Sequence, residues 1–220
     1  MVRPVLDSGD PCPPVALVIA SGNAGKVREF AALLDGLGLD LRPMPSDLTV
    51  EETGSTFAAN ARLKAAAVAQ ATGCWALADD SGLEVGALGG APGVLSARYA
   101  PTDGARIERL LRDLAAAERE ARGAGRAADR AARFVAALAL ADPEGQVVLE
   151  VEGVCEGWIL EAPLGDGGFG YDPVFWVEEA GQTLAQMEPA TKARFAHRGR
   201  AFAALRPGLR RCLATGGQFH

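Results

Sequence analysis

The chain has 220 residues, of which 49% are hydrophobic and 23% are charged, and its formal net charge is −6. This length and composition are typical of one globular domain, which is long enough to divide into two lobes. Acidic and basic residues are interspersed, which argues against broad electrostatic binding to a nucleic-acid polymer. No apolar segment approaches the roughly 20 residues that cross a bilayer, so we expect no membrane association.

The N-terminal segment and the cysteines indicate where the protein works. Residues 1–14 contain four prolines and lack the apolar core of a signal peptide, which predicts a flexible lead-in. The four cysteines are far apart in the chain and form no CxxC pair, as is typical of lone thiols in a reducing compartment. We therefore expect a cytoplasmic protein.

The first predicted elements are a strand over residues 15–20 and a helix that begins near Val27. The continuous apolar run of the strand indicates burial on both of its faces. Between them lies a glycine loop, which consists of Ser21, Gly22, Asn23, Ala24, Gly25 and Lys26. Backbone N–H groups and the helix dipole converge at such a junction, and Lys26 adds a positive charge, so we expect phosphate binding. The spacing differs from the GxxxxGK[ST] phosphate loop, and a plain turn capped by Ser21 or Asn23 is the alternative.

A second helix is predicted to begin at a cap formed by Ser55 or Thr56 and to end near residue 71. The polar residues of interest around its start are Glu51, Glu52, Asn60 and Lys64. The asparagine and the lysine are four residues apart and share one face of the helix. The two glutamates either favour the helix dipole or complete a metal site with a carboxylate from another part of the chain.

The central motif is a buried strand at residues 75–78 that leads into Asp79 and Asp80, followed by a turn at Ser81 and Gly82. Successive side chains of a strand point to opposite faces, so the two carboxylates should have different roles. A carboxylate at a strand end beside a glycine can bind a divalent metal or accept a proton from water. The alternative interpretation is a solvated turn.

The second half of the chain predicts a mixture of helix and strand. The predicted elements are a helix over residues 102–121, a hairpin with strands 134–141 and 147–154, a continuation at 158–160, and a strand at 174–177. Because helices alternate with strands and the hairpin must be antiparallel, we predict an α/β protein with a mixed β-sheet flanked by helices. We expect residues 15–206 to form a single domain and residues 207–220 to form a tail.

A second glycine loop carries two aromatic residues, Phe169 and Tyr171. Exposed rings on a turn either stack on a flat ligand or fill the core beside the strand that follows. The final predicted helix spans residues 189–205, and its ionisable groups of interest are Lys192, His197 and Arg198. A lone histidine is usually structural, so a core position and a binding role for it are both open.

Taken together, these motifs resemble one family, the inosine triphosphate pyrophosphatases, which act on non-canonical purine nucleoside triphosphates. The matching segments are residues 21–29, 51–64, 78–83, 89–99, 168–173 and 196–199. The resemblance covers about residues 15–205 and implies an elongated mixed sheet with two lobes around a nucleotide-binding cleft. It also implies hydrolysis of ITP, dITP and XTP to the monophosphate and pyrophosphate, with Mg²⁺ as the cofactor and a homodimer as the assembly.

Two other activities stay open beside this one. The first is a related nucleotide hydrolase with a different base preference. The second is a non-catalytic module that binds purine nucleotides as a sensor. The complete set of carboxylates argues against a sensor, because a sensor needs no group that activates water.

The resemblance also implies roles for individual residues. Asp80 would be the general base, and Lys26 and Lys64 would hold the phosphates. The implied metal ligands are Asp80, Glu51 and Glu52. A metal-bound carboxylate is a poor base, so Asp79 could take one of the two tasks of Asp80.

At the base end of the nucleotide, the resemblance implies that Phe169 stacks on the purine. The other residues expected to contact the substrate are Asn60, Ser81, Gly170, Tyr171, Asp172, Lys192, His197 and Arg198. Inosine and xanthine present a 6-keto oxygen where adenine presents an amino group. A cationic hydrogen-bond donor at this edge would bind the 6-keto oxygen but would have no acceptor when ATP is bound. Such a mismatch discriminates strongly against ATP.

Overall fold

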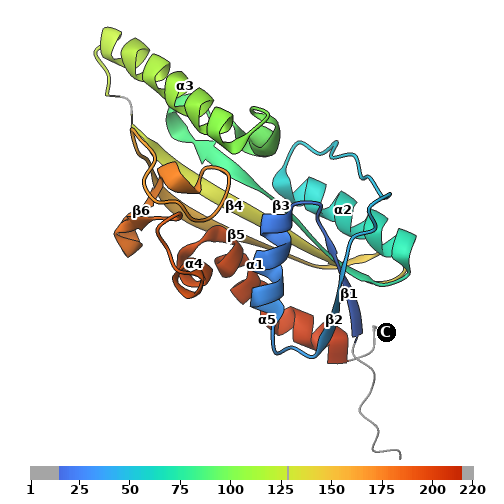
Figure 1. Cartoon of the computed structure of the whole chain (residues 1–220). Coiled ribbons are helices and arrows are strands. Elements are labelled where there is room, and N and C mark those ends of the chain that lie inside the picture. Colours follow the sequence, from blue (N-terminus) through green and yellow to red (C-terminus); the bar gives the residue numbers. More distant parts are fainter. Residues whose placement is uncertain (1–14, 128, 215–220) are drawn as a thin grey trace, which may run out of the picture.

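The computed structural model describes residues 15–127 and 129–214, so the predicted lead-in at residues 1–14 lies outside the described residues. Within these ranges seven strands form one open sheet in the order β2-β1-β3-β4-β5-β6-β7 (Figure 1). The strands are β1 (Val15–Ala20), β2 (Leu39–Pro43), β3 (Trp75–Val85), β4 (Ala131–Ala141), β5 (Val147–Ile159), β6 (Phe175–Val177) and β7 (Gln182–Thr183). The α-helices are α1 (Ala24–Leu34), α2 (Phe57–Thr72), α3 (Asp103–Gly123), α4 (Pro189–Phe195) and α5 (His197–Ala214). None of these helices is long and apolar enough to cross a bilayer.

The sheet is mixed, which confirms the predicted fold class. β1 pairs in parallel with β2 on one side and with β3 on the other. From β3 onward every neighbouring pair of strands is antiparallel, and β4 and β5 form the predicted hairpin. β4 begins earlier than predicted, at Ala131, and β5 runs without a break into the predicted continuation and ends at Ile159, where it pairs with β6.

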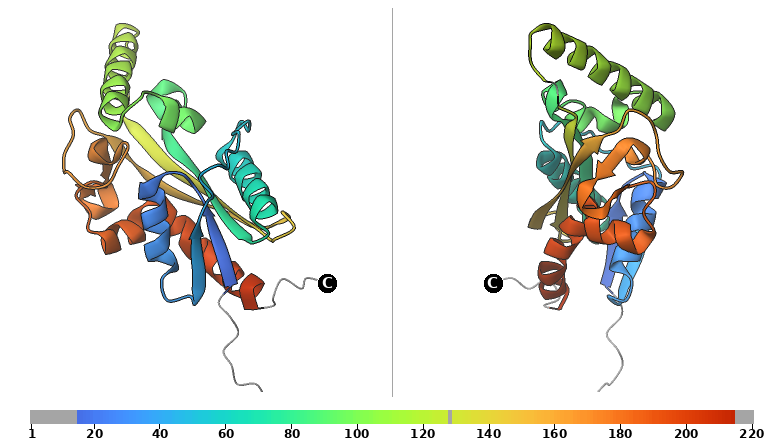
Figure 2. Two further views of the ribbon diagram at one scale, coloured as in Figure 1. Left: turned by 45° about the vertical axis from the view of Figure 1, so that its right-hand side comes forward. Right: turned by 90° about the vertical axis from the view of Figure 1, so that its left-hand side faces the viewer.

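The two faces of the sheet are covered by different helices. Because strand side chains alternate, Leu17 and Ile19 pack with α1 and α5, whereas Val18 and Ala20 pack with α2 on the opposite face. Figure 2 shows α1 and α2 on opposite sides of the sheet. Thr56 caps α2 as predicted, since its side chain accepts a hydrogen bond from the N–H of Ala59. Helices on both faces explain why β1 is apolar throughout.

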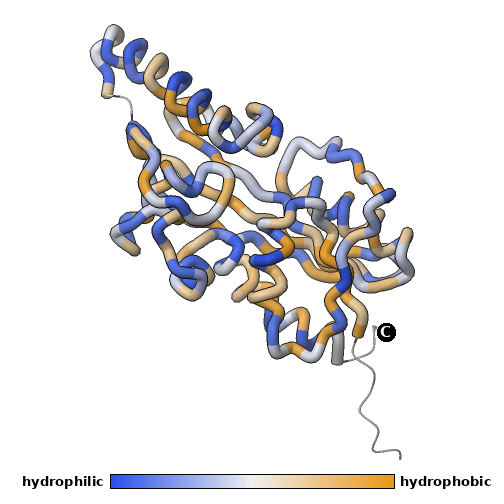
Figure 3. Tube along the Cα trace, viewed as in Figure 1, coloured by the Kyte–Doolittle hydropathy of each residue, from blue (hydrophilic) through white to orange (hydrophobic). Residues whose placement is uncertain are grey.

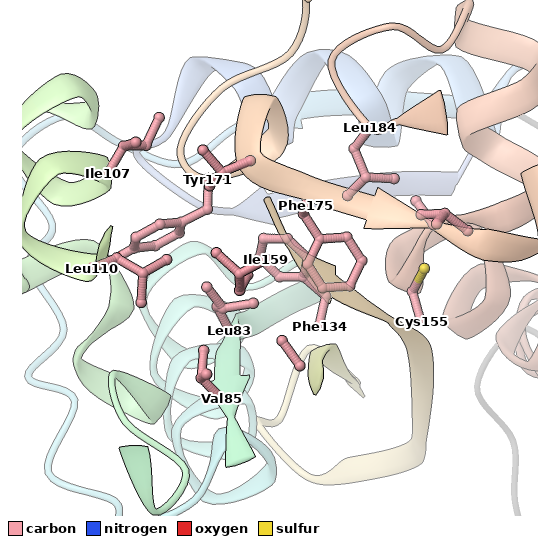
Figure 4. Packing of buried hydrophobic residues seen from close by; sticks show 14 of the residues in the cluster. Leu83, Val85, Ile107, Leu110, Phe134, Cys155, Ile159, Tyr171, Phe175 and Leu184 are labelled. Atoms are coloured by element: carbon pink, nitrogen blue, oxygen red, sulfur yellow. The ribbon is translucent and has the colours of Figure 1, made fainter. Parts of the chain in front are cut away.

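The end of the sheet under α3 has its own hydrophobic core (Figure 4). Ile107 and Leu110 of α3 pack in one cluster with Leu83 of β3 and Ile159 of β5. Tyr171, from the aromatic loop, belongs to the same cluster. Hydrophilic and hydrophobic residues alternate along α3 (Figure 3), as expected for a helix with one buried face.

β3 differs from its prediction, because it does not end in a turn. The strand was expected to end at residue 78, but it continues to Val85 and pairs with β4 along this whole length. Gly82 serves close packing instead, since an added Cβ would lie 2.5 Å from Ser96 Oγ and 2.6 Å from the carbonyl oxygen of Gly93. Long-range pairing with β4 therefore outweighs the local turn preference of the sequence.

The final predicted helix, residues 189–205, consists of two helices. Ala196 has extended backbone angles (φ −73°, ψ 156°) and separates α4 from α5. The corner is tight at Gly199, where an added Cβ would lie 1.7 Å from the carbonyl oxygen of Ala193. α5 also extends to Ala214, through the first residues of the segment expected to form a tail, because its apolar face stays buried against the sheet.

Candidate active site

The candidate site lies on β3, between two apolar clusters on the same face of the sheet. Leu77 belongs to the cluster under α1 and α5, and Leu83 belongs to the cluster under α3. The β3 residues between them on this face are Asp79 and Ser81. β1 pairs with β3 only as far as Ala78, so the glycine loop that follows β1 lies beside the first carboxylate.

The glycine loop is ordered by Asn23, the N-cap of α1. Its side-chain oxygen accepts hydrogen bonds from the N–H groups of Gly25 (2.8 Å) and Lys26 (3.1 Å). The capped turn that was considered as the alternative is therefore present. The loop is also open, because an added Cβ at Gly22 would meet no atom within 4 Å. Phosphate binding at this open loop stays a prediction.

Asp79 is 1% exposed and is surrounded by cations. Its Oδ2 lies 2.6 Å from Lys26 Nζ and 3.5 Å from Arg198 Nε, and it accepts a hydrogen bond from Ser81 Oγ (3.0 Å). Burial favours the neutral carboxyl group, but the charges of Lys26 and Arg198 outweigh it and hold the pKa of Asp79 well below its ordinary value. Its Oδ1 has no hydrogen-bond partner among the described residues. Asp79 is thus a firmly ionised carboxylate and a poor proton acceptor.

Asp80 points to the opposite face of the sheet, toward α2, as strand alternation predicts. Its Oδ2 accepts a hydrogen bond from Asn60 Nδ2 (3.0 Å), and its Oδ1 lies 3.4 Å from Lys64 Nζ. Burial raises the pKa of Asp80 above its ordinary value, although the charges of Lys64 and Lys26 oppose the rise. The two adjacent carboxylates therefore differ in proton affinity, with Asp80 nearer to that of a general base.

Lys64 joins Asp80 to one of the two glutamates. Its Nζ donates to Glu52 Oε1 (2.8 Å) and to the backbone oxygen of Asp79 (2.7 Å). The predicted ligand Glu51, in contrast, is exposed and has no ion pair within the described ranges. The structure therefore brings Glu52, and not Glu51, next to the β3 carboxylates.

The carboxylates suit Mg²⁺ only together with a substrate. No group of three or more acidic, histidine or cysteine side chains forms a metal site in the part of the chain that the structure describes. Asp80 and Glu52 nevertheless meet at the ammonium group of Lys64, where they offer oxygen donors for a hard cation. Since Mg²⁺ is usually held by one or two carboxylates and by substrate phosphates, this pair fits the ion.

A second group of charges links α1 to the last two helices. Glu29 lies 2.6 Å from Lys192 Nζ and 3.0 Å from Arg198 Nη1, and Lys192 is also 2.7 Å from Asp172 Oδ2. Burial lowers the pKa of Lys192, but the two carboxylates outweigh it and raise the pKa above its ordinary value. Glu29 was missed as a site residue, although it follows Lys26 by three residues and so shares a face of α1 with it.

A cavity of about 520 Å³ opens beside this second group. Its lining includes Arg28, Glu29, Phe169, Lys192 and Arg198. The half-buried ring of Phe169 has Lys192 Nζ 5.0 Å and Arg198 Cζ 5.2 Å from its centroid. The ring also rests on Gly25, where an added Cβ would lie 2.8 Å from a ring carbon. A cavity of this size, with one aromatic wall and a few charged groups, is typical of a small-molecule site.

Arg198 connects the two parts of the site. Its Nη2 donates to Ser81 Oγ (2.7 Å) and its Nε lies near Asp79, while its Nη1 contacts Glu29. The predicted residues that meet at β3 are Lys26, Asn60, Lys64, Asp79, Asp80 and Ser81. Two other predicted residues, Phe169 and Lys192, line the cavity, and a third, Asp172, binds Lys192.

Two residues expected at the substrate have side chains in the core instead. Tyr171 is 4% exposed, and its hydroxyl donates to the backbone oxygen of Ser96 (2.9 Å). His197 is 1% exposed and stacks on Phe134 with ring centroids 4.6 Å apart. Burial lowers the pKa of His197 well below its ordinary value, so the ring is neutral. Of the two roles that the sequence leaves open for His197, the structure favours the core position, and its neutral ring adds no cation to the site.

One further residue of the site was not expected from the sequence. Arg98 is exposed and its Nη2 lies 3.1 Å from Glu52 Oε2, at the edge of the β3 carboxylates. It lies in a glycine-rich segment of short 3₁₀ turns, which has no periodic pattern from which its direction could be inferred.

Comparison with known proteins agrees with this geometry. A model of the Ham1 family matches residues 17–208. A dITP/XTP pyrophosphatase from Parasynechococcus marenigrum (strain WH8102) is 59% identical over 199 residues, which cover 90% of this chain and 97% of that protein. Another, from Synechococcus sp. (strain CC9311), is 58% identical over 197 residues, with coverage of 90% and 91%.

Solved structures support the same relationship. A HAM1 protein from Coxiella burnetii matches with a TM-score of 0.78 and 42% identity, and the match covers 89% of this chain and 98% of that chain. The Ham1 protein of Staphylococcus aureus matches with a TM-score of 0.74 and 38% identity, with coverage of 88% and 97%. The family resemblance of the motifs is confirmed, and the chain belongs to the Ham1 family.

Proposed function

We propose that this protein hydrolyses dITP, ITP and XTP between the α and β phosphates and releases the nucleoside monophosphate and pyrophosphate. Relatives that are 58% and 59% identical are named dITP/XTP pyrophosphatases. The observation that carries the proposal is the pair of adjacent carboxylates Asp79 and Asp80, whose pKa values are shifted in opposite directions. The reaction removes non-canonical purine triphosphates from the nucleotide pool.

Asp80 is the general base in this proposal. Its raised pKa makes it a better proton acceptor than an ordinary carboxylate, and the hydrogen bond from Asn60 fixes its orientation. It takes a proton from the water that attacks the α phosphorus. Asp79 stays ionised and orients the cations Lys26 and Arg198.

Charge on the phosphates is neutralised from both faces of β3. Lys26 approaches from α1 and Lys64 from α2, so two ammonium groups flank the place where the leaving pyrophosphate gains charge. The open backbone at Gly22 gives a phosphate access to the start of α1. Mg²⁺, held by Glu52 and the substrate phosphates, would supply further neutralisation at the phosphate oxygens, and Asp80 stays free of the metal to accept the proton.

The residues that line the cavity select the purine base of the nucleotide. Phe169 provides a face on which any purine can stack, so the ring increases affinity but does not distinguish one purine from another. Lys192, which Glu29 and Asp172 keep charged, is the donor for the 6-keto oxygen of inosine and xanthine. The amino group of adenine would leave this donor unpaired, which disfavours ATP.

We propose that the enzyme works in the cytoplasm as a homodimer. Within the described ranges Cys74 and Cys155 form no disulfide bond, which suits a reducing compartment. A homodimer is the assembly that the resemblance of the motifs implies. Light scattering after size-exclusion chromatography measures the mass directly, and a monomer at micromolar concentration would contradict the dimer.

The products of dITP hydrolysis test the proposal. Phosphorus NMR of a reaction with Mg²⁺ in ¹⁸O-labelled water is expected to show dIMP and pyrophosphate, with the label in dIMP because water attacks the α phosphorus. The appearance of dIDP and inorganic phosphate would show a different hydrolase. Binding of dITP without any product would show a sensor.

A further inference from the structure

The aromatic loop is held by two carboxylates from different parts of the chain. The N–H of Phe169 donates to Asp172 Oδ2 (2.9 Å), within the loop itself. The next N–H, that of Gly170, donates to Asp103 Oδ2 (2.7 Å), which lies 67 residues away at the start of α3. Gly170 has a positive φ of 63°, a conformation that suits glycine and turns its N–H toward α3. The backbone on both sides of the Phe169 ring is therefore fixed by charge-assisted hydrogen bonds.

Asp103 is itself held in place. Its Oδ1 lies 2.5 Å from Arg106 Nη1, and Arg106 Nε donates to the backbone oxygen of Ala100 (3.0 Å). Thr102 caps the helix, because its side chain accepts a hydrogen bond from the N–H of Ala105 (3.2 Å). The carboxylate thus has one oxygen bound to a fixed arginine and the other bound to the loop.

The ring of Phe169 needs such support from its backbone. It is only half-buried, and its contacts include Gly25, which has no side chain, and the cations Lys192 and Arg198. Such surroundings do not fix the ring as a packed core would. A ring that stacks on a base binds it more tightly when the ring is preorganised, because ordering the ring during binding would reduce the affinity.

We propose that Asp103 is a positioning residue for the purine site: through the N–H of Gly170 it holds the loop in the conformation that presents Phe169 to the base. This inference rests on the proposed stacking role of Phe169 and adds a residue that does not contact the substrate. It also connects base binding to α3, whose buried face packs into the core of the far end of the sheet.

The test uses single variants of the full chain with dITP as the substrate. Asp103→Ala is expected to raise KM about tenfold, the effect of losing one hydrogen bond to a charged group, while kcat changes less than twofold. Asp103→Asn keeps an acceptor oxygen at the same place and is expected to raise KM less than threefold. The matched control is Asp113→Ala, which removes a carboxylate on α3 that accepts from Tyr99 and not from the loop. It is expected to leave KM unchanged.

A double-mutant cycle shows whether Asp103 acts through the ring. In a Phe169→Ala background, Asp103→Ala is expected to raise KM less than twofold further, because no ring remains to be positioned. An additional tenfold rise in that background would overturn the inference, and so would an unchanged KM in the Asp103→Ala single variant. The cycle can be repeated with dissociation constants for dITP from calorimetry. The coupling between the two residues is then measured even if the products contradict the proposed hydrolysis.

Discussion

The chemistry of the site depends on Asp80, and its removal gives the most direct prediction. Asp80→Asn keeps the shape and the hydrogen bond from Asn60 but loses the proton acceptor. We expect kcat to fall at least 100-fold, about 2.7 kcal/mol in the barrier, with KM for dITP within threefold of wild type. Glu84→Gln on the same strand is the control, because the carboxylate of Glu84 pairs with the exposed Arg133 and not with Asp80 or Lys64 among the described residues. A variant that keeps more than a tenth of the wild-type rate would exclude Asp80 as the base.

The raised pKa of Asp80 also predicts the pH dependence of activity. The base must be ionised, so kcat/KM should fall as the pH falls through the pKa of Asp80 in the free enzyme. Because burial raises this pKa, the acid limb should lie above the ordinary aspartate value of 3.8. A pH profile of kcat/KM with dITP measures it. An acid limb below 3.8 would assign the titration to a group with a lowered pKa, such as Asp79.

Base selectivity should depend on Lys192 rather than on Arg198. The guanidinium group of Arg198 reaches Asp79 and Ser81 on β3, at the phosphate end of the site, so Arg198→Ala should slow dITP and ATP by similar factors. We expect wild type to prefer dITP at least 100-fold and Lys192→Met to reduce the preference to about tenfold, because the donor to the 6-keto oxygen is lost. Measurement of kcat/KM for both nucleotides in both variants decides between the two residues. An unchanged preference in Lys192→Met would contradict the assignment.

Among the elements, β3 depends on a glycine that the sequence suggests for a turn. Gly82→Ala should destabilise the protein by about 1–3 kcal/mol, because the added methyl group meets Ser96 and the backbone of Gly93. Gly104→Ala on α3 is the matched control, since its Cβ would meet no atom within 4 Å. The control should be neutral or stabilising by up to about 1 kcal/mol. Urea unfolding of both variants measures the difference, and equal stabilities would contradict the packing role of Gly82.

Elements with a strong local pattern were predicted well from the sequence. The apolar run of β1, the cap at Thr56 and the hairpin of β4 and β5 all depend on neighbouring residues, and all are confirmed. The predictions are wrong where contacts between residues far apart in the chain determine the structure. β3 continues through Ser81 and Gly82 because β4 pairs with it, and the last helix breaks at Ala196, where no glycine or proline marks a break.

The candidate site shows the same division. The motifs predicted which residues lie at the phosphate end and at the base end of the site. They did not predict which of these residues form ion pairs or hydrogen bonds with one another. Lys26 and Asp79 are separated by 53 residues, and they meet only because β1 and β3 are neighbours in the sheet. Strand alternation did predict that Asp79 and Asp80 face different surroundings, and the structure assigns the cations Lys26 and Arg198 to the first and Lys64 to the second.

At the scale of the whole molecule, the charged residues connect elements that are far apart in the sequence. Arg198 and Lys192 from the last two helices both bind Glu29 of α1, and Arg198 also binds Asp79 of β3. Such buried pairs contribute little stability as a set, but removal of one partner leaves an uncompensated charge. Substrate binding and folding therefore depend on the same ion pairs.

The stability of the Lys26→Met variant at two pH values tests whether folding depends on these ion pairs. In wild type the folded pKa of Asp79 is depressed, so its contribution to stability is present above the unfolded value of about 3.9 and is lost as the pH falls below it. Without Lys26, the largest charge that opposes burial is lost, so the folded pKa of Asp79 should rise. We expect Lys26→Met to lose about 3 kcal/mol of unfolding free energy at pH 7, and much less at pH 3, where Asp79 can protonate. Urea unfolding at both pH values measures the loss, and an equal loss at pH 7 and pH 3 would show that Lys26 stabilises the fold by packing and not by its charge.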